Sequence, residues 1–162
     1  MKLAVFSDTH GLTAGMVSAA RRVRPDLLLH LGDYLRDAEA LRREFPDIPL
    51  RAVKGNCDFA SREEDTITFS AGPVTVFATH GDRYGVKHGT DSLLNAAYFA
   101  GARLVLFGHT HLPLCQNFGG LMLLNPGTAG MSPHPTFAVV EISDAGGLDC
   151  RILDLETLTP PM

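Results

Sequence analysis

The sequence predicts an α/β (α+β) protein in which mixed β-sheets are flanked by helices. Short apolar runs typical of strands recur along the whole chain of 162 residues, and three segments between them have helical composition. Strands and helices alternate at first, whereas the part from Leu104 onward is nearly all strand. The length falls within the range of one compact domain, and no Pro- or Gly-rich linker divides the chain. We therefore expect a single domain over residues 1–162.

The expected strands are apolar runs bounded by Gly, Pro or polar turn residues. They cover residues 3–6, 27–31, 50–53, 66–69, 74–78, 104–107, 121–124, 137–142 and 148–153. The expected helices cover residues 13–23, 38–45 and 90–100, and Thr90, three positions before an apolar stretch, marks the start of the last one. The sequences NFGG at residues 117–120 and DAGG at residues 144–147 predict turns between the last strands.

The composition is that of a globular protein. Apolar residues make up 45% of the chain and charged residues 20%, and the mean hydropathy is +0.07. No apolar run approaches the roughly 20 residues that a membrane-spanning helix needs. The N-terminus turns polar at Ser7, too early for a secretion signal. We therefore expect a cytoplasmic protein without a membrane partner.

Charge and cysteine content narrow the function further. The net charge is -4, and the basic residues are scattered apart from a modest cluster at residues 21–24, so there is no strong nucleic-acid-binding signal. Cys57, Cys115 and Cys150 have no CxxC spacing, which argues against a disulfide framework or a thiolate zinc site and predicts reduced thiols. We therefore expect the chain to bind a small phosphate ester rather than a polyanion such as a nucleic acid.

Five of the expected strands are followed by clusters of metal-ligand residue types beside glycine. These clusters are SDTHG (residues 7–11), LGD (31–33), GNCD (55–58), THGD (79–82) and GHTH (108–111). Ligands of α/β sheets bind beyond the carboxyl ends of the strands, so residues far apart in the sequence can converge there. Within DTH and HTH we expect an extended backbone, which places residues i and i+2 on the same side. One site can therefore collect donors from all five clusters.

The donors are carboxylate oxygens, an amide oxygen and imidazole nitrogens, a set that suits manganese, iron, zinc, cobalt or nickel better than calcium. Each residue alone also has a structural explanation. Asp8 or Asp33 could cap a helix or a turn. His109 and His111 could be ordinary surface or core histidines, and Asn56 could supply a left-handed turn. The joint occurrence of five clusters, each just after an expected strand, favours a metal site.

In this order along the chain, D-x-H, GD, GN-x-D, HG and GHTH resemble the motifs of the calcineurin-like metallophosphoesterase superfamily, from Met1 to about Thr128. GNCD replaces the GNH[DE] of the phosphoprotein phosphatases, and NPGT follows at residues 125–128. These features are most similar to the small single-domain phosphodiesterase branch of bacteria and archaea. The resemblance implies a metallophosphoesterase-like four-layer sandwich, in which two packed mixed β-sheets are flanked by helices and the site lies at the strand ends.

The resemblance also implies roles for seven residues at a dinuclear metal centre. A first metal ion would be held by Asp8, His10 and His111, a second by Asn56, His80 and His109, and Asp33 would bridge them. Asp33, Asn56 and His80 are the residues expected to take part in catalysis. The two divalent ions would be Mn²⁺, with Ni²⁺, Fe²⁺, Co²⁺ or Zn²⁺ as alternatives. A hydroxide that bridges them would attack a phosphodiester.

Two other functions stay open. A phosphomonoesterase could use the same metal site, and the superfamily includes a retromer subunit that uses this fold as a scaffold. All seven matching positions carry metal-binding residue types, which favours an enzyme over a scaffold. Nucleases of the superfamily are much longer chains with extra domains, so a nuclease is a minor alternative for this short chain. The resemblance also allows a homo-oligomer.

Two positions depart from the superfamily pattern. Cys57 stands where phosphatase relatives have a histidine thought to protonate the leaving group, so no clear general acid remains and activated aryl esters should be the better substrates. Asp82 stands where relatives commonly have a second histidine, which leaves the substrate contacts there undefined. Arg83 and Lys87 nearby are either phosphate ligands or solvated loop cations. The histidines without a motif partner, expected to be structural or surface residues, are His30, His88 and His134.

Overall fold

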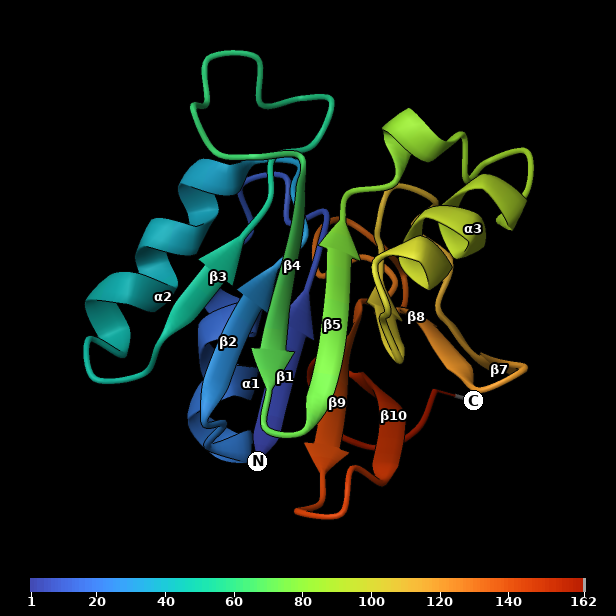
Figure 1. Ribbon diagram of the computed structural model, residues 1–162. Helices are drawn as coiled ribbons and strands as arrows, with labels where there is room; N and C mark the ends of the chain where they lie inside the picture. Colours follow the sequence, from blue (N-terminus) through green and yellow to red (C-terminus); the bar gives the residue numbers. More distant parts are fainter. Residues whose placement is uncertain (162) are drawn as a thin grey trace.

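The computed structural model describes residues 1–161 and contains two five-stranded β-sheets (Figure 1). The first sheet has the strand order β10-β9-β1-β2-β3, and the second has the order β4-β5-β6-β8-β7. The strands of the first sheet are β1 (Lys2–Phe6), β2 (Leu27–His30), β3 (Leu50–Ala52), β9 (Thr136–Ile142) and β10 (Leu148–Asp154). Those of the second are β4 (Thr66–Ala71), β5 (Val74–Thr79), β6 (Leu104–Leu106), β7 (Leu114–Phe118) and β8 (Leu121–Asn125).

Both sheets are mixed, and each has a parallel centre. In the first, β1 pairs in parallel with β2, and β2 with β3, while β9 pairs antiparallel with β1 and β10. In the second, β5, β6 and β8 are parallel, and β4 and β7 are antiparallel edge strands. Because the carboxyl ends of parallel strands meet at one edge of a sheet, this arrangement fixes where a site can form.

Helices cover the outer faces of both sheets. The helical segments of the described residues are α1 (Ala14–Val23), η1 (Leu35–Asp37), α2 (Ala38–Glu44), η2 (Asp82–Tyr84) and α3 (Asp91–Phe99), where η marks a 3-10 turn. The helices α1 and α2 pack on the first sheet, and α3 packs on the second (Figure 1). The order of layers is therefore helix, sheet, sheet, helix.

The alternation of side chains along the strands produces three apolar layers. In β1, Leu3 and Val5 lie in the layer between the two sheets. Ala4 and Phe6 point to the opposite face and join the layer beneath α1 and α2. Val105 of β6 packs in the same way against α3 on the other side of the molecule. This packing confirms the expected four-layer sandwich of two mixed sheets flanked by helices.

All nine expected strands and all three expected helices are present, and their ends lie within one or two residues of the expected ones. Thr90 precedes α3 as expected, although its side chain makes no capping hydrogen bond. The turn expected at residues 117–120 is present only at Gly119 and Gly120. Its first half is wrong, because Asn117 and Phe118 belong to β7. Both glycines have positive φ, 58° and 99°, which favours glycine at these positions.

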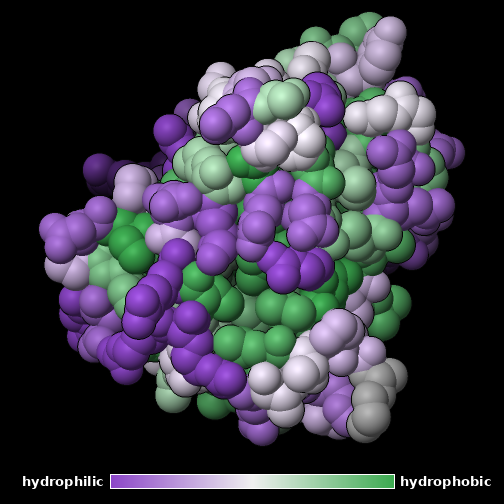
Figure 2. Space-filling view, turned by 90° about the horizontal axis from the view of Figure 1, so that it is seen from below, coloured by the Kyte–Doolittle hydropathy of each residue, from purple (hydrophilic) through white to green (hydrophobic). Residues whose placement is uncertain are grey.

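The end of the molecule away from the carboxyl ends of the parallel strands has a mixed surface. Figure 2 shows a band of apolar side chains there, bordered by hydrophilic ones. Among the described residues, no helix combines the length and the apolar character needed to cross a bilayer.

Candidate metal centre

The carboxyl ends of the parallel strands from both sheets meet at the upper end of the molecule in Figure 1. The seven residues expected to bind metal all follow these strands. Asp8 and His10 follow β1, Asp33 follows β2, Asn56 follows β3, His80 follows β5, and His109 and His111 follow β6. Three strands of the first sheet and two of the second thus supply the side chains, and the cluster straddles the two sheets.

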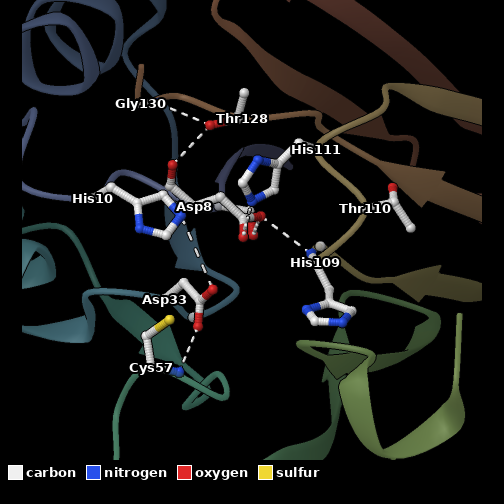
Figure 3. A network of polar contacts seen from close by, with 12 residues as sticks. Asp8, His10, Asp33, Cys57, His109, Thr110, His111, Thr128 and Gly130 are labelled. Carbon is white, nitrogen blue, oxygen red and sulfur yellow. Dashed lines mark hydrogen bonds and ion pairs between the residues drawn. The ribbon is translucent and has the colours of Figure 1, made fainter. Parts of the chain in front are cut away.

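The side chains form two groups that share one carboxylate. Asp8, His10, Asp33 and His111 each offer a ligand atom, and these atoms all lie within 4.8 Å of one another. Asp33, His80 and His109 form a second group under the same limit. The amide oxygen Oδ1 of Asn56 lies 3.2 Å from Nε2 of His80, which places Asn56 beside the second group. Figure 3 shows the side chains of Asp8, His10, Asp33 and His111 close together, with His109 beside them.

His80 is held in the orientation that a metal ligand needs. Its Nδ1 lies 2.7 Å from the carbonyl oxygen of Leu31, so in the neutral ring Nδ1–H donates to that oxygen. The lone pair is then on Nε2, which faces Oδ1 of Asp33 at 3.5 Å and Nδ1 of His109 at 3.2 Å. Fixing a histidine tautomer through a backbone carbonyl is the usual arrangement behind a metal-bound imidazole.

Asp8 presents one oxygen to the cluster. Its Oδ2 accepts hydrogen bonds from Ser7 Oγ and from the backbone N–H of His109. Its Oδ1 lies 3.1 Å from Nε2 of His111 but has no hydrogen-bond partner. Among the described side chains, Asp8 Oδ1 and His10 Nε2 are the buried polar atoms without such a partner. Because buried polar atoms are normally satisfied, this pair fits residues that coordinate a divalent metal ion.

Five of the candidate ligands have a left-handed backbone, which corrects the expectation of an extended chain in DTH and HTH. The φ angles are 56° at Asp8, 45° at His10, 56° at Asp33, 66° at His109 and 60° at His111. Such values are uncommon for residues other than glycine and concentrate at functional sites. The turns, rather than extended alternation, bring Asp8 with His10 and His109 with His111 to the same cluster.

Two motif glycines allow the close approach of these turns. A Cβ atom at Gly55 would collide with Oδ1 of Asp33 and would lie 3.0 Å from Cδ2 of His80. A Cβ atom at Gly108 would collide with Ser7 Oγ and would lie 2.9 Å from Oδ2 of Asp8. No side chain fits at either position without displacing a candidate ligand.

The NPGT element supports the turns that carry the candidate ligands, a role that the sequence did not reveal. The side-chain amide of Asn125 donates to the carbonyl oxygen of Gly108 and to Thr110 Oγ1. The hydroxyl of Thr128 donates to the carbonyl oxygen of Asp8 at 2.8 Å and accepts from the N–H of Gly130, as Figure 3 shows. The only sequence signal for these contacts was the motif itself.

The electrostatics of the cluster favour ionised carboxylates. Burial raises the pKa of Asp33. The His80 ring and the N–H of Cys57 lower this pKa by a larger amount, so it lies well below its usual range. Asp8 shows the same balance, with the ring of His111 as the main lowering influence. Burial lowers the pKa of His80, but the neighbouring Asp33 and Asp8 outweigh it and raise the pKa overall. A metal ion would take the place of the proton on such a histidine.

The two departures from the superfamily pattern lie beside the cluster. The backbone N–H of Cys57 donates to Oδ1 of Asp33 at 2.9 Å, and burial together with the charge of Asp33 raises the pKa of the thiol to about 11. The Cys57 side chain is therefore a neutral thiol near pH 7. Asp82 begins η2, and Arg83 forms an ion pair with Asp65 at 3.0 Å, which agrees with a loop cation. Lys87 is exposed.

The remaining histidines are structural or on the surface, as expected. His30 is fully buried, and its Nε2 lies 3.1 Å from Thr9 Oγ1. Burial lowers the pKa of His30 to about 4, so its ring is neutral near pH 7. His88 and His134 are exposed.

A cluster of carboxylates and imidazoles at the strand ends of a two-sheet sandwich is the architecture of a metal-binding hydrolase. Residues 1–145 match the family model of the calcineurin-like phosphoesterase superfamily domain. The chain therefore belongs to the calcineurin-like phosphoesterase superfamily.

Comparisons with known proteins agree with this assignment. The chain is 35% identical over 134 residues to the probable metallophosphoesterase YsnB of Bacillus subtilis, covering 79% of this chain and 75% of that protein. A crystal structure of a predicted phosphoesterase from Streptococcus pneumoniae superimposes with a TM-score of 0.81 at 26% identity, covering 96% of this chain and 90% of that one.

More distant structures share the fold. Vps29 from Entamoeba histolytica, in complex with Zn²⁺, has a TM-score of 0.77 at 21% identity and covers 96% of this chain and 100% of its own. An archaeal phosphodiesterase has a TM-score of 0.70 at 20% identity and covers 94% of this chain and 100% of its own. At these identities the likeness shows the fold alone.

Proposed function

We propose that this chain hydrolyses small phosphodiesters at a dinuclear metal centre formed by the two groups of ligand atoms. The observation that carries the proposal is the position of Asp33, whose carboxylate belongs to both groups. Its Oδ1 faces His80 at 3.5 Å, and its Oδ2 faces His10 at 4.0 Å. A carboxylate that points one oxygen toward each group is suited to bridge two ions. We propose that both ions are Mn²⁺, because the oxygen and imidazole donors are intermediate between hard and soft ligands.

The residues of the chain have distinct tasks in this reaction. Asp8, His10 and His111 would hold one ion, and Asn56, His80 and His109 would hold the other. Such ions, when bound, supply an activated water and neutralise the charge of the phosphoryl group. Asp33 keeps its negative charge because its pKa is low, and His80 keeps Nε2 directed at the centre through its contact with Leu31.

The preference for diesters and for activated leaving groups is supported by position 57. A thiol with a pKa of about 11 is a poor proton donor at neutral pH, so the leaving group departs largely unassisted. The GNCD turn resembles a form seen in the phosphodiesterase branch, and one structure with this fold is described as a novel archaeal phosphodiesterase. A scaffold role, suggested by the fold of Vps29, would not require metal-ligand residue types at all seven positions around one shared carboxylate.

The test combines metal analysis with substrate comparison. We expect two metal ions per chain and a higher kcat/KM for p-nitrophenyl diesters than for the p-nitrophenyl monoester, and a 2′,3′-cyclic nucleotide is included as the diester with a poor, alkoxide leaving group. Cys57→His should raise kcat/KM for esters with poorer leaving groups relative to kcat/KM for the p-nitrophenyl esters. Cys57→Ser serves as the matched control, because it removes the thiol without adding an imidazole. A preference of the wild type for monoesters would assign a phosphomonoesterase instead. At most one bound ion, with full activity in excess chelator, would refute the metal-dependent reaction.

A further inference from the structure

A cleft of about 670 Å³ lies directly beside the candidate metal centre. It is lined by two turns, residues 34–36 and residues 57–61. The first turn begins immediately after Asp33 and the second immediately after Asn56, so both walls are continuous with candidate ligands. The N–H of Cys57 also donates to Oδ1 of Asp33, which joins the second wall to the shared carboxylate. A group bound in this cleft would therefore lie next to a phosphate held at the metal centre.

Hydrogen bonds to the Asp58 carboxylate hold the two turns that form the cleft in place. The Oδ1 atom of Asp58 accepts from the N–H of Leu35 at 2.8 Å, and its Oδ2 accepts from the N–H of Gly55 at 2.9 Å. Asp58 thus ties the two walls together through Oδ1, while its Oδ2 closes the turn of its own wall. The volume lies within the roughly 300–1,000 Å³ typical of small-ligand sites, which are usually preformed.

Each wall carries one aromatic side chain, Tyr34 on the first and Phe59 on the second. Phe59 is 95% exposed, although a phenyl ring gains stability when it is covered. Tyr34 has a left-handed backbone with φ of 64°, which is rare for a bulky residue and points to a functional constraint. Its ring packs edge-on against His10 with 5.2 Å between the ring centroids, so Tyr34 links the cleft to the metal centre.

The cleft also offers a positive charge. The guanidinium of Arg36 lies over the Tyr34 ring, 4.9 Å from its centroid. Arg36 is exposed, and it has no ion pair with any acidic side chain of residues 1–161. Its donors can therefore reach carbonyl oxygens or an anionic group of a ligand. One exposed ring, Phe59, one half-buried ring, Tyr34, and an arginine thus lie together here, and proteins bind nucleobases by stacking on such side chains.

We propose that this cleft binds the nucleoside part of the substrate, so that the enzyme acts on phosphodiesters that carry a planar heterocyclic base. The inference rests on the proposed function for its catalytic meaning, because the base would be positioned beside a phosphate at the metal centre. Phe59 and Tyr34 would stack with the base, and Arg36 would contact its polar edge or a further phosphate.

The test uses two diesters with the same leaving group. Methyl p-nitrophenyl phosphate and thymidine 5′-(p-nitrophenyl phosphate) both release p-nitrophenolate, but only the second has a base. The protein is loaded with Mn²⁺, and Phe59→Ala is compared with Phe99→Ala, an exposed aromatic (87%) at the end of α3, as a matched control. Phe59→Ala should lower kcat/KM for the thymidine ester roughly tenfold, the order of one base–aromatic stack, and should do so mainly through KM. The methyl ester should be unaffected, and Phe99→Ala should change neither.

A binding measurement separates this inference from the proposed function. Calorimetry should show that thymidine 5′-monophosphate binds to the wild type and about tenfold more weakly to Phe59→Ala. If neither diester is hydrolysed but this binding pattern is found, the proposed function fails and the base-binding cleft stands. If the wild type hydrolyses both diesters equally well, or if Phe59→Ala affects both equally, the cleft does not bind the base. Absence of nucleotide binding together with absence of hydrolysis would overturn both.

Discussion

His111 has a left-handed backbone, with φ of 60°, and this conformation should cost stability whenever no metal is bound. We expect His111→Gly to give a more stable metal-free protein than His111→Ala. The two variants remove the same side chain, including the Nε2 atom that lies 3.1 Å from Asp8 Oδ1. The loss of that contact therefore cancels in the comparison, and the difference reports on the backbone alone.

The magnitude follows from two opposing effects. A left-handed conformation costs a non-glycine residue about 1–2 kcal/mol relative to glycine. Glycine loses more conformational freedom on folding, which offsets about 0.5–1 kcal/mol of this gain. The free energy of unfolding of His111→Gly should therefore exceed that of His111→Ala by roughly 0.5–1 kcal/mol.

The assay is urea denaturation in excess chelator, with the free energy of unfolding extrapolated to water. Thr110 is the control position, because it is the neighbour of His111 and its φ lies outside the left-handed region. At Thr110 the order should reverse, with the glycine variant less stable than the alanine variant by about 0.5–1 kcal/mol. If His111→Gly were no more stable than His111→Ala, or if both positions gave the same order, the turn would not be strained as argued.

Three further outcomes are expected at the site and in the core. Asp33→Asn should lower kcat by at least roughly 100-fold, because asparagine carries no charge. The circular dichroism spectrum should be unchanged, because asparagine can still accept the hydrogen bond from Cys57. Near wild-type turnover would show that the site is misplaced. A chelator should abolish hydrolysis and Mn²⁺ should restore it; full activity without metal would contradict this. The pKa of His30 is lowered from 6.5 to about 4, so its contribution to stability is complete above pH 6.5 and is lost as the pH falls toward 4, by about 3 kcal/mol in total. His30→Gln should therefore lose less stability than the wild type between pH 7 and pH 4.5 in urea denaturation, and parallel curves would refute this assignment.

The fold was predictable where strands are buried on both faces. Central strands such as β1 and β6 read as continuous apolar runs because each face meets an apolar layer. The edge strand β7 was not predicted, because its sequence LCQNF is largely exposed and pairs on one side only, with β8. An exposed edge strand needs no apolar pattern, so periodicity does not reveal it.

The residue types of the candidate site were visible in the sequence, but their geometry was not. Ligand positions require donor side chains, and these recur in short motifs. The left-handed turns at Asp8 and His109 depend on the whole tertiary arrangement, and local alternation wrongly predicted extended chain there. The backbone carbonyl that orients His80 belongs to Leu31, and every residue has such a carbonyl, so no sequence signal could have identified it.

The position of β1 in the first sheet has a consequence for the order of events during synthesis. This strand is complete at Phe6, yet its antiparallel neighbour β9 begins only at Thr136. At the ribosomal rate of roughly 5–20 residues per second, on the order of ten seconds separates the two. A nascent chain that has passed His111 but not reached β9 contains all seven candidate ligands and still leaves one edge of β1 without a partner. The last hairpin to emerge, β9–β10, therefore completes the first sheet only after all seven candidate ligands have been synthesised.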